Sequence, residues 1–328
     1  MEFINHRLNI IPIDVYIDPP YPVDKAIITH AHSDHARSGH KNVLATKQTI
    51  QLMKLRYGEN CAESFQELQY GEKIKINDIE ISLFPSGHIL GSSQVLLNKN
   101  GYKVVITGDY KTKKDPTVTE FELIRCNTLV TEATFGLPIF CHPKPSVEIK
   151  KIINSLKQRN GRNHLLGVYA LGKAQRLIKL LRENGFTEKI YIHGAMEKLC
   201  KYYEDQGIKL GDIEKVDAKK QNLTNKLILC PPSALRDRWS RKFNNCVISL
   251  ASGWMCIKQR VKQNLIEIPL IISDHSDWNE LTQTIKGTNA ENVWITHGRE
   301  DGLVRWCTVK GLNAKPLSII GRDEEVEQ

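Results

Sequence analysis

The segment Thr29-His30-Ala31-His32-Ser33-Asp34-His35 places three histidines and one aspartate within six positions. Imidazole nitrogens and carboxylate oxygens are the ligands that zinc and similar metals take in proteins. The apolar run 26–28 before the segment predicts a buried strand. The His-x-His alternation then puts His30 and His32 on one side of an extended chain. Asp34 and His35, just beyond, can face a second ion, so the segment predicts a metal site.

Further polar groups follow predicted apolar strands at distant points of the chain. His88 lies in a glycine-flanked loop after the predicted strand 74–84, and glycine allows a backbone to approach a metal or a phosphate closely. Ligand sites collect at the carboxyl ends of strands in α/β folds, so such groups can converge. The other strand-end groups are His30, Asp109, Glu132, His275 and His297.

A site for two metal ions needs a ligand set for each ion and a carboxylate that bridges them. Asp109 is the natural bridge, because it is the acid between the two sets in the chain. Two ions a few ångströms apart activate a water and bind phosphoryl oxygens. We assign His30, His32 and His88 to the first ion, and Asp34, His35 and His297 to the second.

Three acidic or basic groups remain for supporting roles. His275 can give a proton to a leaving oxygen, and Glu132 can orient its imidazole. Their alternative roles are a cap of a helix or turn for Glu132 and a capped helix start for His275. Asp18, before a proline turn, can cap that turn or hold a ligand imidazole by its second N–H group. These two roles of Asp18 are compatible.

Helical and strand patterns alternate from Ser146 to about residue 250, which indicates a parallel α/β subdomain without a His/Asp cluster of its own. The predicted strands 268–272 and 292–295 then lead to His275 and His297, as if one metal-bearing sheet were interrupted and completed. We therefore expect three segments: a metal-binding domain over 1–145, an inserted domain over 146–266, and the completing part of the first domain over 267–328.

The chain has 328 residues, a formal net charge of +9 and a pI of about 9.0. A basic balance favours an anionic partner, and nucleic acid is the commonest large one. Gly172-Lys173 opens a predicted helix, where phosphate is favoured. Trp239 and Phe243 are interleaved with arginines, a pattern suited to single strands. The candidate contacts are Lys111, Lys113, Lys114, Lys173, Arg176, Arg236, Arg238 and Arg241, each of which has a solvated surface role as its alternative.

The eight cysteines are scattered and form no Cys-x-x-Cys pair, which indicates reduced thiols in a reducing compartment. The sequence shows neither a basic-then-apolar leader nor an apolar run long enough to span a membrane. From these features we expect a cytoplasmic protein that does not associate with a membrane.

The motifs together resemble a known family. His30-x-His32-x-Asp34-His35, Gly87-His88 and Gly108-Asp109 resemble the metallo-β-lactamase fold. Glu132, His275 and His297 resemble the three extra motifs of its β-CASP nucleases, in which an α/β cassette follows the first motif. The phrases 170–176 and 251–255 also resemble cassette sequences. The chain length, residues 134–138 and the Ser-Gly-Trp-Met phrase are most similar to bacterial DNA-ligase-associated exonucleases, which are themselves similar to mRNA 3′-end processing factors.

The resemblance implies a four-layer αββα sandwich with an inserted β-CASP domain, two zinc ions with manganese as the alternative metal, and phosphodiester hydrolysis. We expect a DNA exonuclease that acts in DNA repair and is functionally linked to a DNA ligase. His297 is a histidine, as in the RNA-processing branch, whereas many eukaryotic DNA-repair members carry an apolar residue there. The choice between DNA and RNA therefore stays open.

Four alternatives to a DNA exonuclease follow from the same residues. The first is processing of RNA 3′ ends by the same chemistry. The second is hydrolysis of a small thioester, lactone or lactam, which would need neither the insert nor Glu132 and His275. The third is a redox di-iron site, which would want a carboxylate in place of His32. The fourth is a nucleic-acid-binding scaffold without activity. It is disfavoured because every expected ligand position carries a metal-binding residue.

Overall fold

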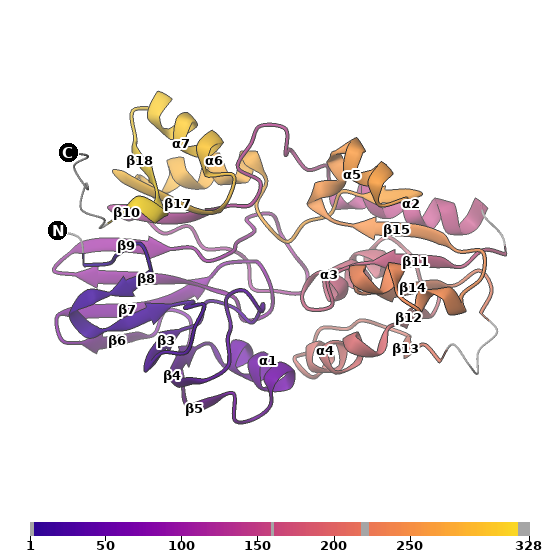
Figure 1. Ribbon diagram of the computed structural model, residues 1–328, viewed down its shortest axis with the longest axis horizontal. Helices are drawn as coiled ribbons and strands as arrows, with labels where there is room; N and C mark the ends of the chain where they lie inside the picture. Colours follow the sequence, from indigo (N-terminus) through magenta and orange to yellow (C-terminus); the bar gives the residue numbers. More distant parts are fainter. Residues whose placement is uncertain (1–2, 159–160, 218–222, 321–328) are drawn as a thin grey trace, which may run out of the picture. The chain divides into compact units, whose positions relative to one another are not determined.

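The structure is a computed structural model that describes residues 3–158, 161–217 and 223–320. The chain forms two compact units, and the expected α/β class is confirmed. The first unit contains residues 1–141 and 275–328, and the second contains residues 142–274. Each unit has its own sheets and helices (Figure 1). The limits of the second unit thus lie a few residues outside the 146–266 expected for the insert.

A five-stranded sheet of the first unit has the order β1-β2-β3-β4-β5 and is parallel from β2 to β5. Helix α1 (Lys47–Tyr57) packs beside β5, and the side chain of Thr46 accepts a hydrogen bond from the Thr49 N–H to cap its start. The strands are β1 (Asn9–Ile10), β2 (Val15–Ile17), β3 (Lys25–Ile27), β4 (His40–Ala45) and β5 (Ala62–Glu67).

A seven-stranded sheet of the same unit has the order β18-β17-β10-β9-β8-β7-β6. The single strand predicted over 74–84 is wrong, because a turn with Asn77 at φ 55° splits it into the hairpin of β6 and β7. Asparagine tolerates this left-handed conformation better than most residues. The strands are β6 (Lys73–Ile76), β7 (Ile79–Pro85), β8 (Ser93–Lys99), β9 (Tyr102–Ile106), β10 (Thr128–Ala133), β17 (Asn292–Gly298) and β18 (Asn313–Pro316).

Successive residues of β9 point into two different cores, as expected from the alternation of side chains along a strand. Val104 and Ile106 pack in a core shared with residues of the five-stranded sheet, such as Ile27. Val105 packs on the opposite face with Leu281 of α6 (Trp278–Thr288) and with residues of α7 (Glu300–Val309). The seven-stranded sheet is therefore buried on both faces, by a second sheet on one side and by helices on the other (Figure 1).

The second unit is built on one parallel sheet with the order β13-β12-β14-β11-β15-β16. The expectation that strand 268–272 belongs to the metal-bearing sheet is wrong, because Ile268–Leu270 pairs with β15 in this sheet. Its strands are β11 (His164–Gly167), β12 (Ile190–Ile192), β13 (Ile213–Lys215), β14 (Leu227–Cys230), β15 (Val247–Ala251) and β16 (Ile268–Leu270). Its helices are α2 (Pro145–Gln158), α3 (Lys173–Glu183), α4 (Gly194–Asp205) and α5 (Lys258–Gln263).

Single 3₁₀ turns complete the described secondary structure: η1 (Ile11–Ile13), η2 (Pro232–Arg236), η3 (Ser240–Lys242), η4 (Gly253–Cys256) and η5 (Leu317–Ile319). Within the residues that the structure describes, no helix has both the length and the apolar character needed to cross a membrane.

Candidate metal centre

The candidate ligands reach one place because of strand direction. β9, β10 and β17 are parallel neighbours, and β7 runs in the same direction, since both β7 and β9 are antiparallel to β8. The carboxyl ends of these four strands therefore share one edge of the seven-stranded sheet. This edge carries His88, Asp109, Glu132 and His297.

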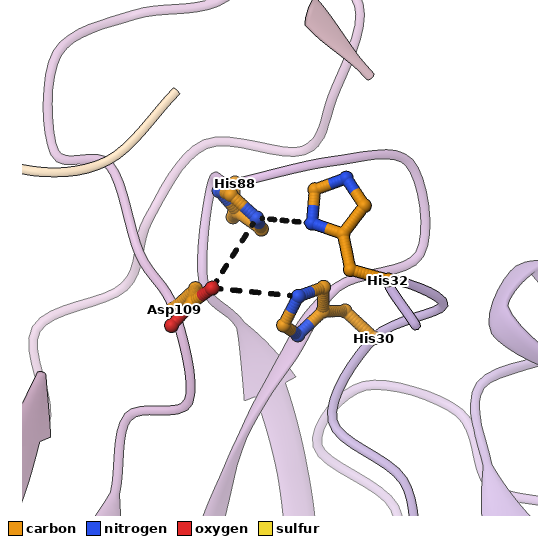
Figure 2. Close-up of side chains that lie close together, drawn as sticks. All are labelled: His30, His32, His88 and Asp109. Atoms are coloured by element: carbon orange, nitrogen blue, oxygen red, sulfur yellow. Dashed lines mark hydrogen bonds and ion pairs between the residues drawn. The ribbon is translucent and has the colours of Figure 1, made fainter. Parts of the chain in front are cut away.

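The first cluster contains His30, His32, His88 and Asp109, the set expected for the first ion with its bridging acid (Figure 2). Oδ2 of Asp109 lies 3.6 Å from Nε2 of His30 and 3.8 Å from Nε2 of His88. Nε2 of His88 lies 3.0 Å from Nδ1 of His32. One ligand atom from each residue lies within 4.8 Å of the others.

These distances fit a tetrahedral metal ion. Bonds of about 2.0–2.1 Å to zinc put tetrahedral ligand atoms about 3.3 Å apart, and the separations around Asp109 and His88 are 3.0–3.8 Å. Nε2 of His30 and Nε2 of His35 are buried without a hydrogen-bond partner among the described residues. A buried nitrogen in that state is costly unless something else coordinates it. The residues present therefore fit a bound metal.

A second cluster shares Asp109 and adds His35 and His297. Nε2 of His35 lies 3.4 Å from Oδ2 of Asp109, and the rings of His35 and His297 are 4.8 Å apart. His297 is exposed and has φ 51°, a strained conformation for histidine of the kind often found at functional sites. Asp34, also expected here, is 69% exposed, with Oδ2 3.9 Å from Nε2 of His35. Asp34 therefore lies at the margin of this cluster.

Asp18 occupies the position that its supporting role requires. Its Oδ2 lies 2.7 Å from Nδ1 of His35, and its Oδ1 accepts the N–H group of Thr29 at 2.7 Å. The hydroxyl of Thr29 also donates to Asp18 and lies 3.1 Å from Nδ1 of His30. A carboxylate that receives Nδ1–H leaves Nε2 of His35 as the metal-binding nitrogen.

The electrostatics of the centre favour neutral His30 beside ionised Asp109. Burial, together with the neighbouring imidazoles of His35 and His88, lowers the pKa of His30 well below its usual value. Burial alone would also lower the pKa of His35, but the carboxylates of Asp109 and Asp18 raise it well above the usual value. Burial would raise the pKa of Asp109, yet His35 and His275 hold it well below its usual range.

Glu132 and His275 form a pair next to Asp109. Oε2 of Glu132 lies 3.0 Å from Nδ1 of His275, and the same nitrogen is 3.8 Å from Oδ2 of Asp109. Oε1 of Glu132 accepts the backbone N–H of Tyr110 at 2.8 Å. Glu132 is buried, whereas His275 is partly exposed. A carboxylate that holds one imidazole nitrogen beside a metal centre suits proton transfer from the other nitrogen.

Backbone contacts of two further residues, Arg56 and Gly87, also hold the ligand loops. Arg56 donates a hydrogen bond to the carbonyl oxygen of Ala31, between the first two ligand histidines. Gly87, at φ +73°, precedes His88, and a Cβ there would lie 2.2 Å from the Lys111 carbonyl oxygen. The segment after Asp109 therefore approaches the His88 loop closely. The glycines flanking His88 gave a sequence signal for this approach, but Arg56 gave none.

The lysines after Asp109 differ from the expectation of nucleic-acid contact. Lys111 is 3% exposed and forms an ion pair with Glu280, with a distance of 2.6 Å. Its ammonium faces the protein interior, so we withdraw Lys111 as a phosphate contact. Lys113 is partly exposed and pairs with Asp277 at 2.6 Å. Lys114 is 80% exposed and pairs only with the surface residue Glu120 in what the structure describes, at 3.1 Å.

The basic candidates of the second unit separate into two groups. Lys173 forms an ion pair with Asp274 at 2.8 Å, and Arg176 donates to the carbonyl oxygen of Ser273, so both have partners within their own unit. Arg236, Arg238 and Arg241 are exposed, and Arg236 also donates to Asn264 at 2.8 Å.

The aromatic residues interleaved with these arginines are partly buried. Trp239 and Phe243 contact each other at 5.0 Å and pack against the core residues Leu165, Val216 and Ile228. Their rings therefore contribute to the hydrophobic core of the second unit, beside the exposed arginines.

Two curated proteins show what the sequence is similar to. A protein named Probable DNA ligase, from Opitutus terrae, is 25% identical over 98% of this chain. A protein named Endoribonuclease ysh1, from Aspergillus fumigatus, is 36% identical over 39% of this chain. The matches span 31% and 14% of the lengths of those two proteins, respectively. No model of a known protein family matches the chain.

A solved structure supports the fold alone. The crystal structure of a protein of unknown function from Enterococcus faecalis superposes with a TM-score of 0.57, covering 83% of this chain and 75% of that one. The two sequences are 13% identical in this comparison.

Proposed function

We propose that this chain, a relative of the β-CASP nucleases of the metallo-β-lactamase fold, hydrolyses phosphodiester bonds at a centre for two divalent metal ions. The relationship expected from the motifs is confirmed by the sequence relatives. In this proposal the first unit is the metallo-β-lactamase domain, with its two sheets and flanking helices as a four-layer αββα sandwich. The second unit is the inserted β-CASP domain.

One observation carries the proposal: Asp109 belongs to both metal-capable clusters and to a third group with Glu132 and His275. A carboxylate shared by two ligand sets is what two neighbouring ions require. His30, His32 and His88 would hold one ion with Asp109, and His35 and His297 would hold the other, with Asp34 at its margin. Zinc is the expected metal and manganese the alternative. Two such ions, when bound, supply charge that activates water and stabilises phosphoryl oxygens.

The protein's own groups manage the proton of the reaction. Hydrolysis forms a bond from a water oxygen to phosphorus, releases one proton of that water to the solvent, and breaks the bond from phosphorus to the leaving oxygen. Glu132 accepts a hydrogen bond from Nδ1 of His275 and so stabilises the protonated imidazole. Nε2 of His275 then gives its proton to the leaving oxygen, a step that typically contributes about 10²- to 10⁴-fold in rate.

We assign DNA as the substrate, and exonucleolytic repair as the role. The support is that the similarity to the Probable DNA ligase of Opitutus terrae extends over 98% of this chain, within a protein named for acting on DNA. The same observation supports a functional link to a DNA ligase. Lys114, Arg236, Arg238 and Arg241 remain as candidate phosphate contacts.

RNA 3′-end processing is the second candidate. Two observations favour it: the higher identity to Endoribonuclease ysh1, 36% over 135 residues, and a histidine at position 297. The reaction and the site residues would be the same, and only the polymer would differ.

All eight cysteines are free thiols in the structure, and five of them are buried. Such thiols suit a reducing compartment, and the cytoplasm is the location that we propose.

The test is degradation of end-labelled single- and double-stranded DNA and RNA by the purified chain, with zinc or manganese supplied. Stepwise shortening of DNA from one end is expected. Preferential shortening of RNA would replace the first candidate by the second. No cleavage of either polymer by metal-loaded protein would overturn the proposed function. Asp109→Ala serves as the inactive control, and Lys41→Met, at an exposed ion pair with Asp24, serves as the active control.

A further inference from the structure

We propose that the buried ion pair of Lys111 with Glu280 positions His275 for proton transfer. This inference rests on the proposed function, because the position of His275 matters to the rate only if its imidazole serves the reaction. Lys111 and Glu280 would be positioning residues that act through His275. The relevant contacts join residues 109–113, Glu132 and residues 275–280.

Lys111 connects two segments that are far apart in the sequence. Its Nζ donates to Oε2 of Glu280 at 2.6 Å and to the backbone carbonyl oxygen of His275 at 3.0 Å. Both side chains of the ion pair are 3% exposed. The ammonium of Lys111, two positions after Asp109, therefore fixes the backbone of His275 itself.

Several hydrogen bonds besides that from Lys111 hold the carboxylate of Glu280. Its Oε2 also accepts the N–H of Asp277, and its Oε1 accepts the backbone N–H groups of Thr112 and Lys113 and the Thr112 hydroxyl. Asp277 and Glu280 form a capping box at the start of α6, where the helix dipole favours negative charge. The rigid start of α6 thus clamps the segment that follows Asp109.

Ser276 completes the connection next to His275. Its backbone N–H donates to the carbonyl oxygen of Tyr110 at 2.7 Å, and its hydroxyl donates to the same oxygen at 3.0 Å. The N–H of Tyr110 in turn donates to Glu132, which holds Nδ1 of His275. His275 is therefore fixed through its backbone by Lys111 and through its ring by Glu132.

Stability alone does not account for a buried charge pair at this place. Removing two charges from water is costly, and apolar replacements of similar volume are often as stable as a buried ion pair. An ammonium offers what such a replacement lacks, because it has three donors and can bind a carboxylate and a carbonyl oxygen together. Here the carbonyl oxygen is that of His275. The ion pair therefore fixes the position of the His275 backbone in addition to joining Lys111 to Glu280.

The decisive variant removes both charges at once. Lys111→Met alone leaves Glu280 buried with only the more distant ammonium of Lys113, at 3.5 Å, and we expect a marked loss in melting temperature. The double variant Lys111→Met/Glu280→Gln leaves no unpaired charge, and glutamine keeps an acceptor for residues 112 and 113. We expect it to recover most of the melting temperature and to bind as much zinc per chain as the wild type. Lys41→Met is the matched lysine control.

Two substrates then separate positioning from folding. On an oligonucleotide, whose leaving oxygen needs a proton, the double variant should lose about tenfold or more in kcat with little change in KM. On bis(p-nitrophenyl) phosphate, whose phenolate leaves without a proton, its kcat should stay within about twofold of the wild type. Recovery of oligonucleotide kcat together with melting temperature, or equal losses on both substrates, would overturn the proposal.

A structural readout keeps this inference separate from the proposed function. In a crystal structure of the double variant, the 3.0 Å hydrogen bond between Nδ1 of His275 and Glu132 should be broken or lengthened. An unchanged His275 would refute the positioning role even if the wild-type chain cleaved no phosphodiester. Absence of wild-type cleavage with a displaced His275 would refute the proposed function alone.

Discussion

Oε2 of Glu132 lies 3.0 Å from Nδ1 of His275, although the two residues are 143 positions apart in the sequence. The second unit, residues 142–274, is inserted between them. Glu132 is carried by β10 at the sheet edge, and His275 is the first residue after the insert. Glu132 and His275 therefore lie on either side of the insert in the sequence but meet within the first unit.

Replacement of His275 by alanine should separate chemistry from metal binding. We expect His275→Ala to lower kcat on an oligonucleotide by about 10²- to 10⁴-fold, because the proton donor is gone. Zinc content measured by atomic emission should stay at the wild-type level. A loss of zinc as severe as that of His30→Ala would instead make His275 a ligand.

Replacement of Asp109 should weaken both metal binding and cleavage. Asp109 belongs to three metal-capable groups, so Asp109→Ala is expected to lower zinc content per chain and to reduce cleavage by at least about 100-fold. Circular dichroism should show retained secondary structure. Full activity of the metal-loaded variant would rule out a shared carboxylate.

Asp18 should tune metal affinity without binding the metal itself. Asp18→Asn weakens the 2.7 Å interaction with Nδ1 of His35, and removal of such a partner typically lowers metal affinity by about 10- to 100-fold. Competition with a chromophoric chelator would measure the change. An unchanged zinc affinity would limit Asp18 to the turn before Thr29.

The Glu280 carboxyl should make stability depend on acid pH. Burial alone would raise its pKa, but Lys111 and the surrounding hydrogen bonds lower it below the usual value. Stability from a depressed carboxyl pKa is fully present above the unfolded-state pKa of about 4.3 and is lost as pH falls through the folded-state pKa. Urea unfolding of Glu280→Gln at several pH values should therefore show a shallower loss below about pH 4.3 than the wild type. Parallel curves would contradict this role.

The exposed arginines of the second unit should contribute salt-dependent affinity. For each phosphate of a single strand that a variant no longer neutralises, the slope of log K against log salt decreases by about 0.7. We expect Arg238→Ala and Arg241→Ala each to lower affinity for single-stranded DNA and to flatten that slope, as measured by fluorescence anisotropy. Lys173→Ala, which removes an internal partner of Asp274, is the comparison whose slope should stay unchanged if the protein folds. An unchanged slope for both arginine variants would exclude these arginines as phosphate-binding residues.

The local sequence was sufficient to identify the groups that meet at the sheet edge. The alternation at His30 and His32, and acids or imidazoles placed just after apolar strands, translate directly into position because strand ends converge. The same reasoning failed at 268–272. An apolar strand followed by Asp-His has the same local sequence pattern whichever sheet it joins. The pairing of 268–270 with β15 depends on long-range packing, which a local pattern does not contain.

The local sequence also did not reveal the partners of the basic residues. Lys111 follows Asp109 closely, which made it a natural candidate for the mouth of the site. Its burial depends on Glu280, 169 positions later, whose side chain turns toward it from the start of α6. The Asp-x-x-Glu spacing of residues 277–280 is typical of a helix start, but a capping pattern does not reveal what else the carboxylate binds.

The discontinuous first unit has a consequence for the order in which the chain folds during synthesis. The second unit is continuous, so its sheet can form as soon as residue 274 has left the ribosome. In the first unit, β10 pairs with β9 on one side and with β17 on the other. The side of β10 that faces β17 stays unpaired until residues 292–298 are made. The last candidate ligand, His297, lies on that same late strand. The candidate metal centre therefore cannot be complete before β17 has been made.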